Sequence, residues 1–355
     1  MAMSGGVDSS VAAALCVEHG LRTIGITLAM WPTSREAQRD RGCCSIDAVE
    51  DARRVAARLR VPHYVWNLEE DFHGEVIVAF EAEYAAARTP NPCVRCNEKI
   101  KFGALLSRAR AVGASHLATG HYARRGRRGH SWTLHRARDA RKDQVYTLHR
   151  LGQDQLARAV FPIGDLPDKA AVRGEAERLG LSTASKPDSQ ELCFLDGSLR
   201  EELRRRLAGR FRPGPVVDGG GRIVGEHEGL PFYTVGQRSG LLLRPNRPDS
   251  PPHYVIDLDQ ERNAVVVGPV ASLQRSCVEL EEVRWISGET PAAALQCSAQ
   301  FHAHGEATAV VAVPLPGGRS RLDCASPVRG VSPGQSAVLF AGDEVLGGGV
   351  IASSR

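Results

Sequence analysis

The sequence predicts an α/β protein in three parts: a domain built on a parallel sheet, a small mixed domain and a C-terminal β-barrel. The first half of the chain alternates short β-rich runs with helical periodicity, which is typical of a parallel α/β sheet. From about residue 273 only short alternating segments recur, as in small all-β barrels. We therefore predict domains at residues 1–197, 198–272 and 273–355.

The elements of the first domain follow from periodicity. Runs rich in β-branched and aromatic residues predict strands at residues 23–30, 63–68 and 116–120. Apolar residues three or four positions apart predict an amphipathic helix over 46–60, and residues 168–179 before a glycine predict another. In the last domain, alternation predicts barrel strands at residues 307–313 and 336–340. A proline-rich stretch at 245–252 predicts a loop between modules.

Composition excludes several classes of protein. The 355 residues are 42% hydrophobic, and no apolar run reaches the roughly 18 residues of a membrane span. The N-terminus has neither a basic nor an apolar signal region, so we expect a cytoplasmic protein without membrane association. Nine cysteines in a reducing compartment favour catalytic or metal-binding thiols over a disulfide framework.

The net charge of +4 is unevenly distributed along the chain. Residues 121–150 hold nine Lys or Arg against two Asp, while residues 250–355 hold more acids than bases. Such asymmetry is typical of a chain that binds a polyanion through one region, although a solvated arginine-rich surface has the same composition. We expect phosphate contacts at residues 124–128 and 200–206.

The run Ser4-Gly5-Gly6-Val7-Asp8-Ser9-Ser10 is the most informative motif. Its glycines let backbone N–H groups approach an anion, and a helical run beginning at Val11 follows at once. The Gly-Lys-Ser/Thr ending of a Walker loop is absent. This motif resembles the PP-loop of ATP pyrophosphatases (adenine nucleotide alpha hydrolase-like proteins), which cleave ATP between the α and β phosphates.

A strand is expected immediately before a loop of this kind. Only three residues, Met1-Ala2-Met3, precede Ser4. We therefore expect either a start further upstream or a sheet that lacks its central strand and folds poorly.

Further motifs extend the resemblance across the chain. They are Asn91-Pro92-Cys93-Val94-Arg95-Cys96-Asn97, Ala118-Thr119-Gly120-His121-Tyr122, Lys142-Asp143-Gln144, Lys186 to Phe194, and Pro333-Gly334-Gln335. In this order, and with the PP-loop, they resemble the tRNA-specific 2-thiouridylases of bacterial type. Those enzymes replace the C2 oxygen of the wobble uridine, position 34, by sulfur. The resemblance implies a sulfurtransferase that adenylates the C2 oxygen and then transfers sulfur from a cysteine persulfide.

The resemblance also implies roles for individual residues. Cys96 is expected to be the nucleophile and Cys193 the persulfide carrier, and the two are expected to form a transient disulfide. The implied ATP-binding residues are Ala2, Met3, Ser4, Gly5, Gly6, Val7, Asp8, Ser9, Leu28 and Gly120. The implied contacts to the target base and the tRNA are Asn91, Pro92, Cys93, His121, Lys142, Asp143, Gln144 and Gln335. Charge reversal at residues 204–206 is expected to weaken tRNA binding and to leave the affinity for ATP intact.

The expected cofactor is ATP with Mg²⁺, and the expected partners are the anticodon region of tRNA and a sulfur-relay protein or cysteine desulfurase. The family favours a monomer. Cys93, Cys96 and Cys193 could also hold an iron–sulfur cluster or zinc, with Cys43-Cys44 joining the cluster or lining the pocket. Two rival functions stay open: a PP-loop synthetase for a small molecule, and a non-enzymatic RNA-binding module with metal-bound cysteines.

Overall fold

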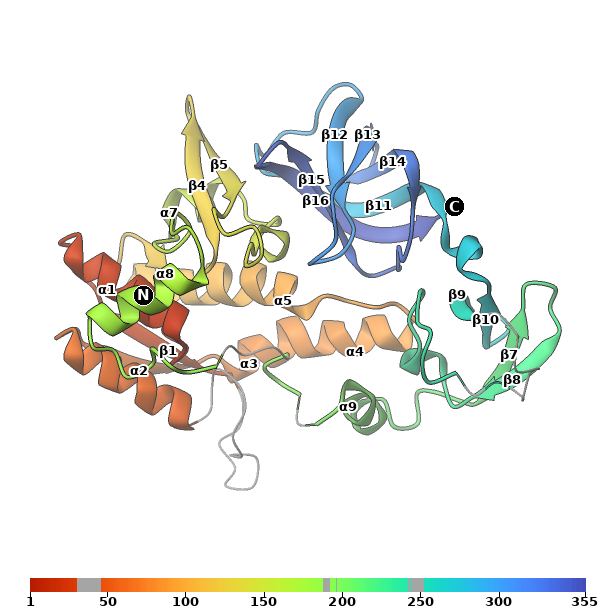
Figure 1. The fold of residues 1–355 in the computed structure, drawn as a ribbon, viewed down its shortest axis with the longest axis horizontal. Helices are drawn as coiled ribbons and strands as arrows, with labels where there is room; N and C mark the ends of the chain where they lie inside the picture. Colours follow the sequence, from red (N-terminus) through yellow and green to blue (C-terminus); the bar gives the residue numbers. More distant parts are fainter. Residues whose placement is uncertain (31–45, 188–191, 196, 242, 244–251) are drawn as a thin grey trace.

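The computed structural model describes residues 1–30, 46–187, 192–195, 197–241, 243 and 252–355. Cys43, Cys44 and most of the loop expected at 245–252 lie outside these residues. Figure 1 shows an α/β body, a small strand-rich body and a β-barrel arranged around a long central helix. The predicted fold class is confirmed.

The parallel sheet is centred on the N-terminus. β1 (Gly25–Ala29) pairs in parallel with β2 (His63–Asn67), and β3 (Leu117–Ala118) pairs in parallel with β6 (Ala159–Val160). Residues 1–3 join the two pairs: Ala2 forms a parallel bridge with Ile26, and its N–H donates to the carbonyl of Ala118 at 2.9 Å. Three residues thus occupy the position expected of a full strand. The strands predicted at 23–30, 63–68 and 116–120 correspond to β1, β2 and β3.

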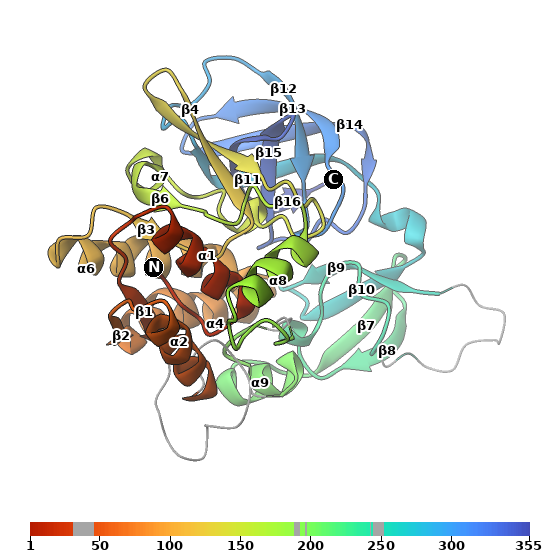
Figure 2. The ribbon, with the colours of Figure 1, turned by 60° about the vertical axis from the view of Figure 1, so that its left-hand side comes forward.

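Three helices cover this sheet and bury mainly small apolar side chains: α1 (Val7–Glu18), α2 (Ile46–Arg58) and α8 (Lys169–Arg178). The two helices predicted from periodicity are α2 and α8. α1 packs closely against α8, and its residues Val11 to Ala14 are fully inaccessible. Figure 2 shows α1 and α8 side by side. Asp168 caps α8 by accepting from the N–H of Ala171.

The central helix runs continuously through three segments, α5 (Pro92–Arg95), η2 (Cys96–Leu105) and α6 (Leu106–Ala111). Its middle segment, η2, is π-helical, a geometry often found at functional sites. It packs against a second helical rod of α3 (Glu69–Phe72), η1 (His73–Ile77) and α4 (Val78–Ala85). Two short elements, η3 (Val145–Thr147) and α7 (Gln153–Arg158), complete the domain.

The middle module is a four-stranded sheet in the order β8-β7-β10-β9, in which β7 and β10 are parallel. Helix α9 connects it to the first domain. The elements are α9 (Leu199–Arg206), β7 (Gly214–Asp218), β8 (Ile223–His227), η4 (Leu230–Phe232), β9 (Tyr254–Asp259), β10 (Ala264–Gly268) and η5 (Val270–Leu273).

The C-terminal module is a closed barrel. Its strands run in the order β11-β14-β13-β12-β15-β16, and the β11–β16 pairing closes it. They are β11 (Arg275–Trp285), β12 (Leu295–Gln300), β13 (Thr308–Leu315), β14 (Arg319–Val328), β15 (Ser336–Ala341) and β16 (Glu344–Ser354). The segments predicted at 307–313 and 336–340 are β13 and β15.

One contact between domains was not predicted. The hairpin of β4 (Ala123–Arg128) and β5 (Ser131–Arg136) leaves the α/β domain and pairs with β16, so it extends the barrel sheet. Arg125 stacks on Trp132 of this hairpin, with its guanidinium carbon 4.2 Å from the ring centre. The barrel is therefore attached to the α/β domain through shared backbone pairing.

Candidate active site

The loop Ser4–Ser9 begins helix α1. The N-cap Gly6 has no side chain to satisfy the first N–H groups of the helix, so these amides and the positive end of the helix dipole are available to an anion. The hydroxyls of Ser9 and Ser10 both donate to the Gly6 carbonyl, at 3.0 and 2.9 Å, and the Ser4 N–H donates to Ser9 Oγ at 3.2 Å. These bonds hold the loop in a fixed curve.

Two glycines are required by close backbone approaches. Gly5 has φ of +69°, and a Cβ there would lie 2.2 Å from the carbonyl oxygen of Ala48 in α2. A Cβ at Gly120 would lie 2.7 Å from the Ser9 nitrogen. Gly120, which follows β3, is therefore packed directly on the phosphate loop, as expected of an ATP-binding position.

Charged side chains fix both sides of the loop. Lys169 Nζ lies 2.7 and 2.9 Å from the carboxylate oxygens of Asp8, and the Tyr122 hydroxyl donates to the same carboxylate at 2.7 Å. Lys186 Nζ donates to the Gly5 carbonyl at 3.1 Å and to Asp51 at 2.6 Å. Two ammonium groups thus contact the Ser4–Ser9 loop directly.

Ala2 and Ile26 form a bridge between neighbouring segments. Leu28 of β1 lies two residues after Ile26, and Ser4 lies two residues after Ala2, so Leu28 and Ser4 are at the same level of the sheet. Leu28 is buried and faces the core. Its predicted contact with adenine is therefore compatible with its level in the sheet, at the carboxyl edge where α/β folds bind ligands.

His121 connects the phosphate loop to the central helix. It follows Gly120, is buried, and its Nε2 accepts from Lys101 Nζ at 3.5 Å, while its Nδ1 lies 2.8 Å from the Thr119 hydroxyl. Burial and the nearby Lys101 ammonium hold the pKa of His121 well below its usual value. The imidazole is therefore neutral, and its Nδ1–H donates to Thr119.

The first turns of the central helix carry two thiols. Asn91 caps the helix: its Oδ1 accepts from the N–H of Cys93 at 3.1 Å and of Val94 at 3.4 Å, and Pro92 occupies the position after the cap. Cys93 is exposed and Cys96 is buried. The positive end of a helix favours a thiolate, which is the reactive form of cysteine.

Cys193 approaches the same helix from a separate segment. It is half-buried in a turn in which the Leu195 N–H donates to the Leu192 carbonyl. The ring of the next residue, Phe194, lies 6.3 Å from that of Phe72 and 4.9 Å from that of Phe80. Since α3 packs on η2, this anchoring brings the Cys193 segment to the rod that supports Cys96. Both cysteines belong to or contact one hydrophobic cluster.

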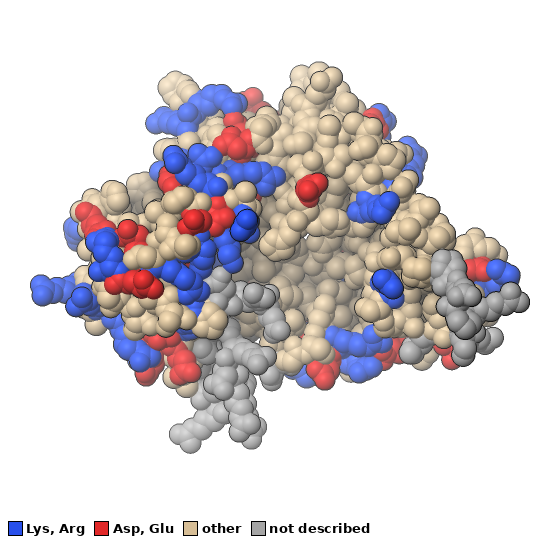
Figure 3. Space-filling model, in the orientation of Figure 1, with Lys and Arg blue, Asp and Glu red and all other residues tan. Residues whose placement is uncertain are grey.

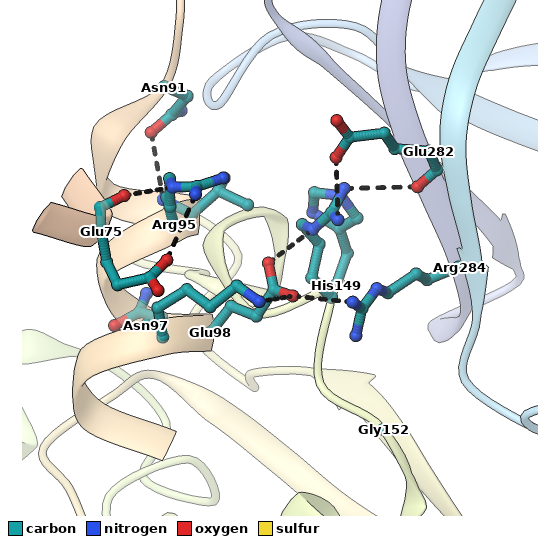
Figure 4. Close-up of polar contacts among 12 residues, drawn as sticks. Glu75, Asn91, Arg95, Asn97, Glu98, His149, Gly152, Glu282 and Arg284 are labelled. Carbon is teal, nitrogen blue, oxygen red and sulfur yellow. Dashed lines mark hydrogen bonds and ion pairs between the residues drawn. The ribbon is translucent and has the colours of Figure 1, made fainter. Parts of the chain in front are cut away.

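An ion-pair network lies two residues beyond Cys96 (Figure 4). Glu98 is 4% exposed and contacts Arg150 at 2.7 Å and Arg284 of β11 at 3.1 Å. Burial raises the pKa of Glu98, but the cations around it outweigh burial and hold the pKa below its usual value. Arg150 also contacts Glu282 of β11 at 3.1 Å. A cavity of about 470 Å³ borders this network, lined by Glu98, Lys99, Gln153, Asp154, Gln155 and Arg284.

A metal cluster on the thiols is not supported by the positions of the side chains. Within the described parts of the chain, no three His, Cys, Asp or Glu side chains are grouped as metal ligands, and Cys93, Cys96 and Cys193 differ in exposure. Cys43 and Cys44 lie outside those parts.

Several residues expected to contact RNA have partners within the protein. Asp143 accepts from Arg136 at 2.8 Å and from the Ala137 N–H at 2.9 Å, and burial raises its pKa. The Gln144 side chain accepts from the Tyr122 N–H at 3.0 Å. Gln335 donates to the Thr89 carbonyl at 2.8 Å. Lys142 is half-buried in the same loop as Asp143.

The arginines expected to bind phosphate are also ion-paired. Arg204 contacts Glu228 at 2.5 Å, Arg205 contacts Glu202 at 2.6 Å, and Arg206 contacts Glu81 at 3.2 Å as well as Glu202. Charge reversal of all three would also break these ion pairs, and its effect on the binding of tRNA and ATP stays a prediction. In Figure 3, basic and acidic side chains are intermixed over α1, α2 and α8, whereas the hollow at the centre of this face has few charges.

Sequence reasoning missed the contacts of Tyr122 and Lys169 with Asp8 of the phosphate loop. The composition of the chain offered a way to select these lysines as candidates, because only five of the 45 basic residues are lysine. Lys169 and Lys186 contact the phosphate loop and Lys101 contacts His121. In a chain that otherwise uses arginine, a retained lysine marks a position where a compact ammonium fits.

A glycine-rich loop at a helix N-terminus on a parallel sheet is typical of PP-loop nucleotide-binding proteins. Family models agree over the chain: a tRNA methyl transferase HUP domain matches residues 1–197, a tRNA methyl transferase PRC-barrel domain 201–269, and an aminomethyltransferase beta-barrel domain 275–351.

Curated relatives identify the family. The tRNA-specific 2-thiouridylase MnmA of Moorella thermoacetica is 47% identical, with 99% of each chain covered. That of Acidothermus cellulolyticus is 48% identical over 100% of this chain and 97% of the relative. The chain belongs to the MnmA family of tRNA-specific 2-thiouridylases.

Among solved structures, the U34-tRNA thiolase NcsA from Methanococcus maripaludis, with its [4Fe-4S] cluster, matches with a TM-score of 0.35 at 18% identity, covering 59% of this chain and 66% of that chain. No helix within the described residues is long and apolar enough to cross a membrane.

Proposed function

We propose that this tRNA sulfurtransferase adenylates the C2 oxygen of uridine 34 and then replaces that oxygen by sulfur from Cys193. The C2 carbonyl of uracil is a poor electrophile, and its oxygen is a poor leaving group. ATP binds with Mg²⁺ at Ser4–Ser9 and transfers AMP to the C2 oxygen. The adenylated C2 carbon is a better electrophile, and its oxygen can leave as part of AMP. The first amides of α1, with Lys169 and Lys186 beside the loop, stabilise the phosphates during this step.

The second step uses the two thiols. The terminal sulfur of a Cys193 persulfide attacks C2, and AMP leaves with the former C2 oxygen. The Cys96 thiolate then attacks Cys193 Sγ, which forms a Cys96–Cys193 disulfide and releases 2-thiouridine. We propose a sulfur-relay protein or a cysteine desulfurase as the source of the persulfide. A reductant must reopen the disulfide after each turnover.

The observation that carries this proposal is that one helix reaches both the thiols and the neighbourhood of the phosphate loop. The helix that begins with Cys93 and Cys96 also provides Lys101, whose ammonium contacts His121 beside the phosphate loop. Cys193 joins from the segment anchored on α3 and α4. A base placed at Asn91-Pro92-Cys93 could therefore reach both the nucleotide and the sulfur. Such a base would have to be flipped out of the anticodon stack.

Serine substitutions test whether the two thiols act in sulfur transfer and not in adenylation. Cys96→Ser and Cys193→Ser are each expected to reduce 2-thiouridine formation at least about a thousandfold, since the thiolate is the reacting group. The RNA-dependent release of pyrophosphate by Cys193→Ser should stay within about tenfold of the unmodified enzyme, because adenylation needs no thiol.

Cys324→Ser is the matched control. Cys324 lies in the barrel, where burial raises its pKa to about 11, so it has little thiolate character. Its replacement should leave thiolation unchanged. Substantial 2-thiouridine formation by either Cys96→Ser or Cys193→Ser would contradict the assigned roles.

A further inference from the structure

The loop that enters the thiol helix is held by the barrel. The Thr89 N–H donates to the Pro333 carbonyl at 2.8 Å, and the Gln335 side-chain amide donates to the carbonyl of Thr89 at 2.8 Å and, more weakly, of Pro90 at 3.5 Å. Both contacts come from the segment just before β15. The contacted residues, Thr89 and Pro90, immediately precede Asn91, whose side chain caps the helix.

The fit between the two segments is tight. Gly334 has φ of +89°, and a Cβ there would lie 2.8 Å from the Thr89 nitrogen and 3.0 Å from Arg88 Cβ. Arg88 in turn contacts Glu83 at 2.7 Å and Glu281 of β11 at 2.5 Å. The barrel therefore meets this loop through a backbone hydrogen bond, a side-chain amide and an ion pair.

The middle module also contacts Thr89 of this loop. The hydroxyls of Thr89 and Thr234 lie 3.1 Å apart, and Ser332 Oγ donates to the Val235 carbonyl at 3.0 Å. All three modules thus contact one another within a few residues of the Asn91 cap.

The helix is held from the barrel side a second time. Two residues after Cys96, Glu98 contacts Arg284 of β11 directly and Glu282 of β11 through Arg150. Between these two attachments lie the capped turn and both thiols. The segment that carries Cys93 and Cys96 is consequently attached to the barrel on both sides.

We propose that Gln335 is a positioning residue for the thiol helix: by binding the Thr89 and Pro90 carbonyls it fixes the Asn91 cap and hence the places of Cys93 and Cys96. This role differs from the direct contact with tRNA expected from the sequence. It rests on the proposed function only for the chemistry of the thiols, because the contact itself lies within the protein.

The test replaces the amide in the full-length chain. Gln335→Met keeps the length of the side chain and removes both donors. The amides of Cys93 and Val94 should then exchange with deuterium about tenfold faster, because the cap loses its support. In single-turnover reactions at saturating tRNA, thiolation should slow by about tenfold, whereas the Kd for tRNA should stay within about twofold, since displacing a reacting group costs rate rather than binding.

Two further variants complete the design. Gln296→Met makes the same change at an exposed position on β12 and should alter none of these quantities. Gln335→Asn keeps the amide but shortens its reach, so it should accelerate exchange at residues 93 and 94 in the same direction, and it serves if Gln335→Met does not fold.

Unchanged exchange at residues 93 and 94 would overturn the proposal. So would a raised Kd for tRNA with a normal rate at saturation, which would make Gln335 an RNA contact. If the unmodified enzyme formed no 2-thiouridine, the proposed function would fail while the exchange measurements would still decide the role of Gln335.

Discussion

The phosphate loop and the thiol loop are stabilised in opposite ways. Within the phosphate loop, Ser9 and Ser10 bond to Gly6, three and four residues away. At the thiol loop, Thr89 bonds to Gln335, 246 residues away, and to Thr234, 145 residues away. The first loop is held by its own serines and by Tyr122, Lys169 and Lys186 of the same domain, whereas the second depends on the barrel and the middle module.

This difference suggests how the two steps could be coordinated. The phosphate loop is held by contacts within its own domain and does not depend on the other modules for these contacts. A thiol loop that depends on the barrel is sensitive to anything that binds across the modules, as a large RNA would. Contacts between modules therefore hold the thiol loop, whereas contacts within one domain hold the phosphate loop.

The largest expected effect breaks the local site. Gly120→Ala would place a Cβ 2.7 Å from the Ser9 nitrogen and 2.8 Å from the Asp8 carbonyl carbon, which are backbone atoms at the start of α1. Displacing the loop by such an amount should lower RNA-dependent pyrophosphate release by about a hundredfold. Steady-state assays with saturating ATP measure it.

Gly174→Ala is the control for this change. Gly174 lies within α8, and a Cβ there meets no atom within 4 Å. Its replacement should leave activity unchanged and add up to about 1 kcal/mol to the free energy of unfolding, because alanine favours helix. A Gly120→Ala enzyme with normal pyrophosphate release would show that this packing does not matter.

A smaller effect separates local from distant contacts within α9. Arg206 is 17% exposed and pairs with Glu202, which is 1% exposed, and with Glu81, 125 residues away. Arg205 is 67% exposed and pairs with Glu202 of its own helix.

Arg206→Leu should therefore lower the free energy of unfolding by about 3 kcal/mol, as for a buried pair that loses one partner. Arg205→Leu should lower it by less than about 1 kcal/mol. Urea denaturation of both variants measures the difference. Equal destabilisation by the two changes would contradict the importance of the distant contact.

The same distinction explains what could be predicted from the sequence. The phosphate loop, strands β1 to β3 and helices α2 and α8 were predictable because short patterns specify them. The addition of the β4–β5 hairpin to the barrel sheet was not, since its register with β16 depends on residues more than 200 positions away. Likewise, the motif around Gln335 indicated a functional position, but only the fold shows that its amide faces Thr89.

The central claim is that the C2 oxygen of uridine 34 leaves the RNA as part of AMP. A tRNA carrying ¹⁸O at C2 of that uridine, supplied with ATP and a persulfide donor, provides the most direct measurement. Mass spectrometry should find the heavy oxygen in the phosphate of AMP, in an amount equal to the 2-thiouridine formed. Thiolated RNA accompanied by unlabelled AMP would contradict activation through adenylation.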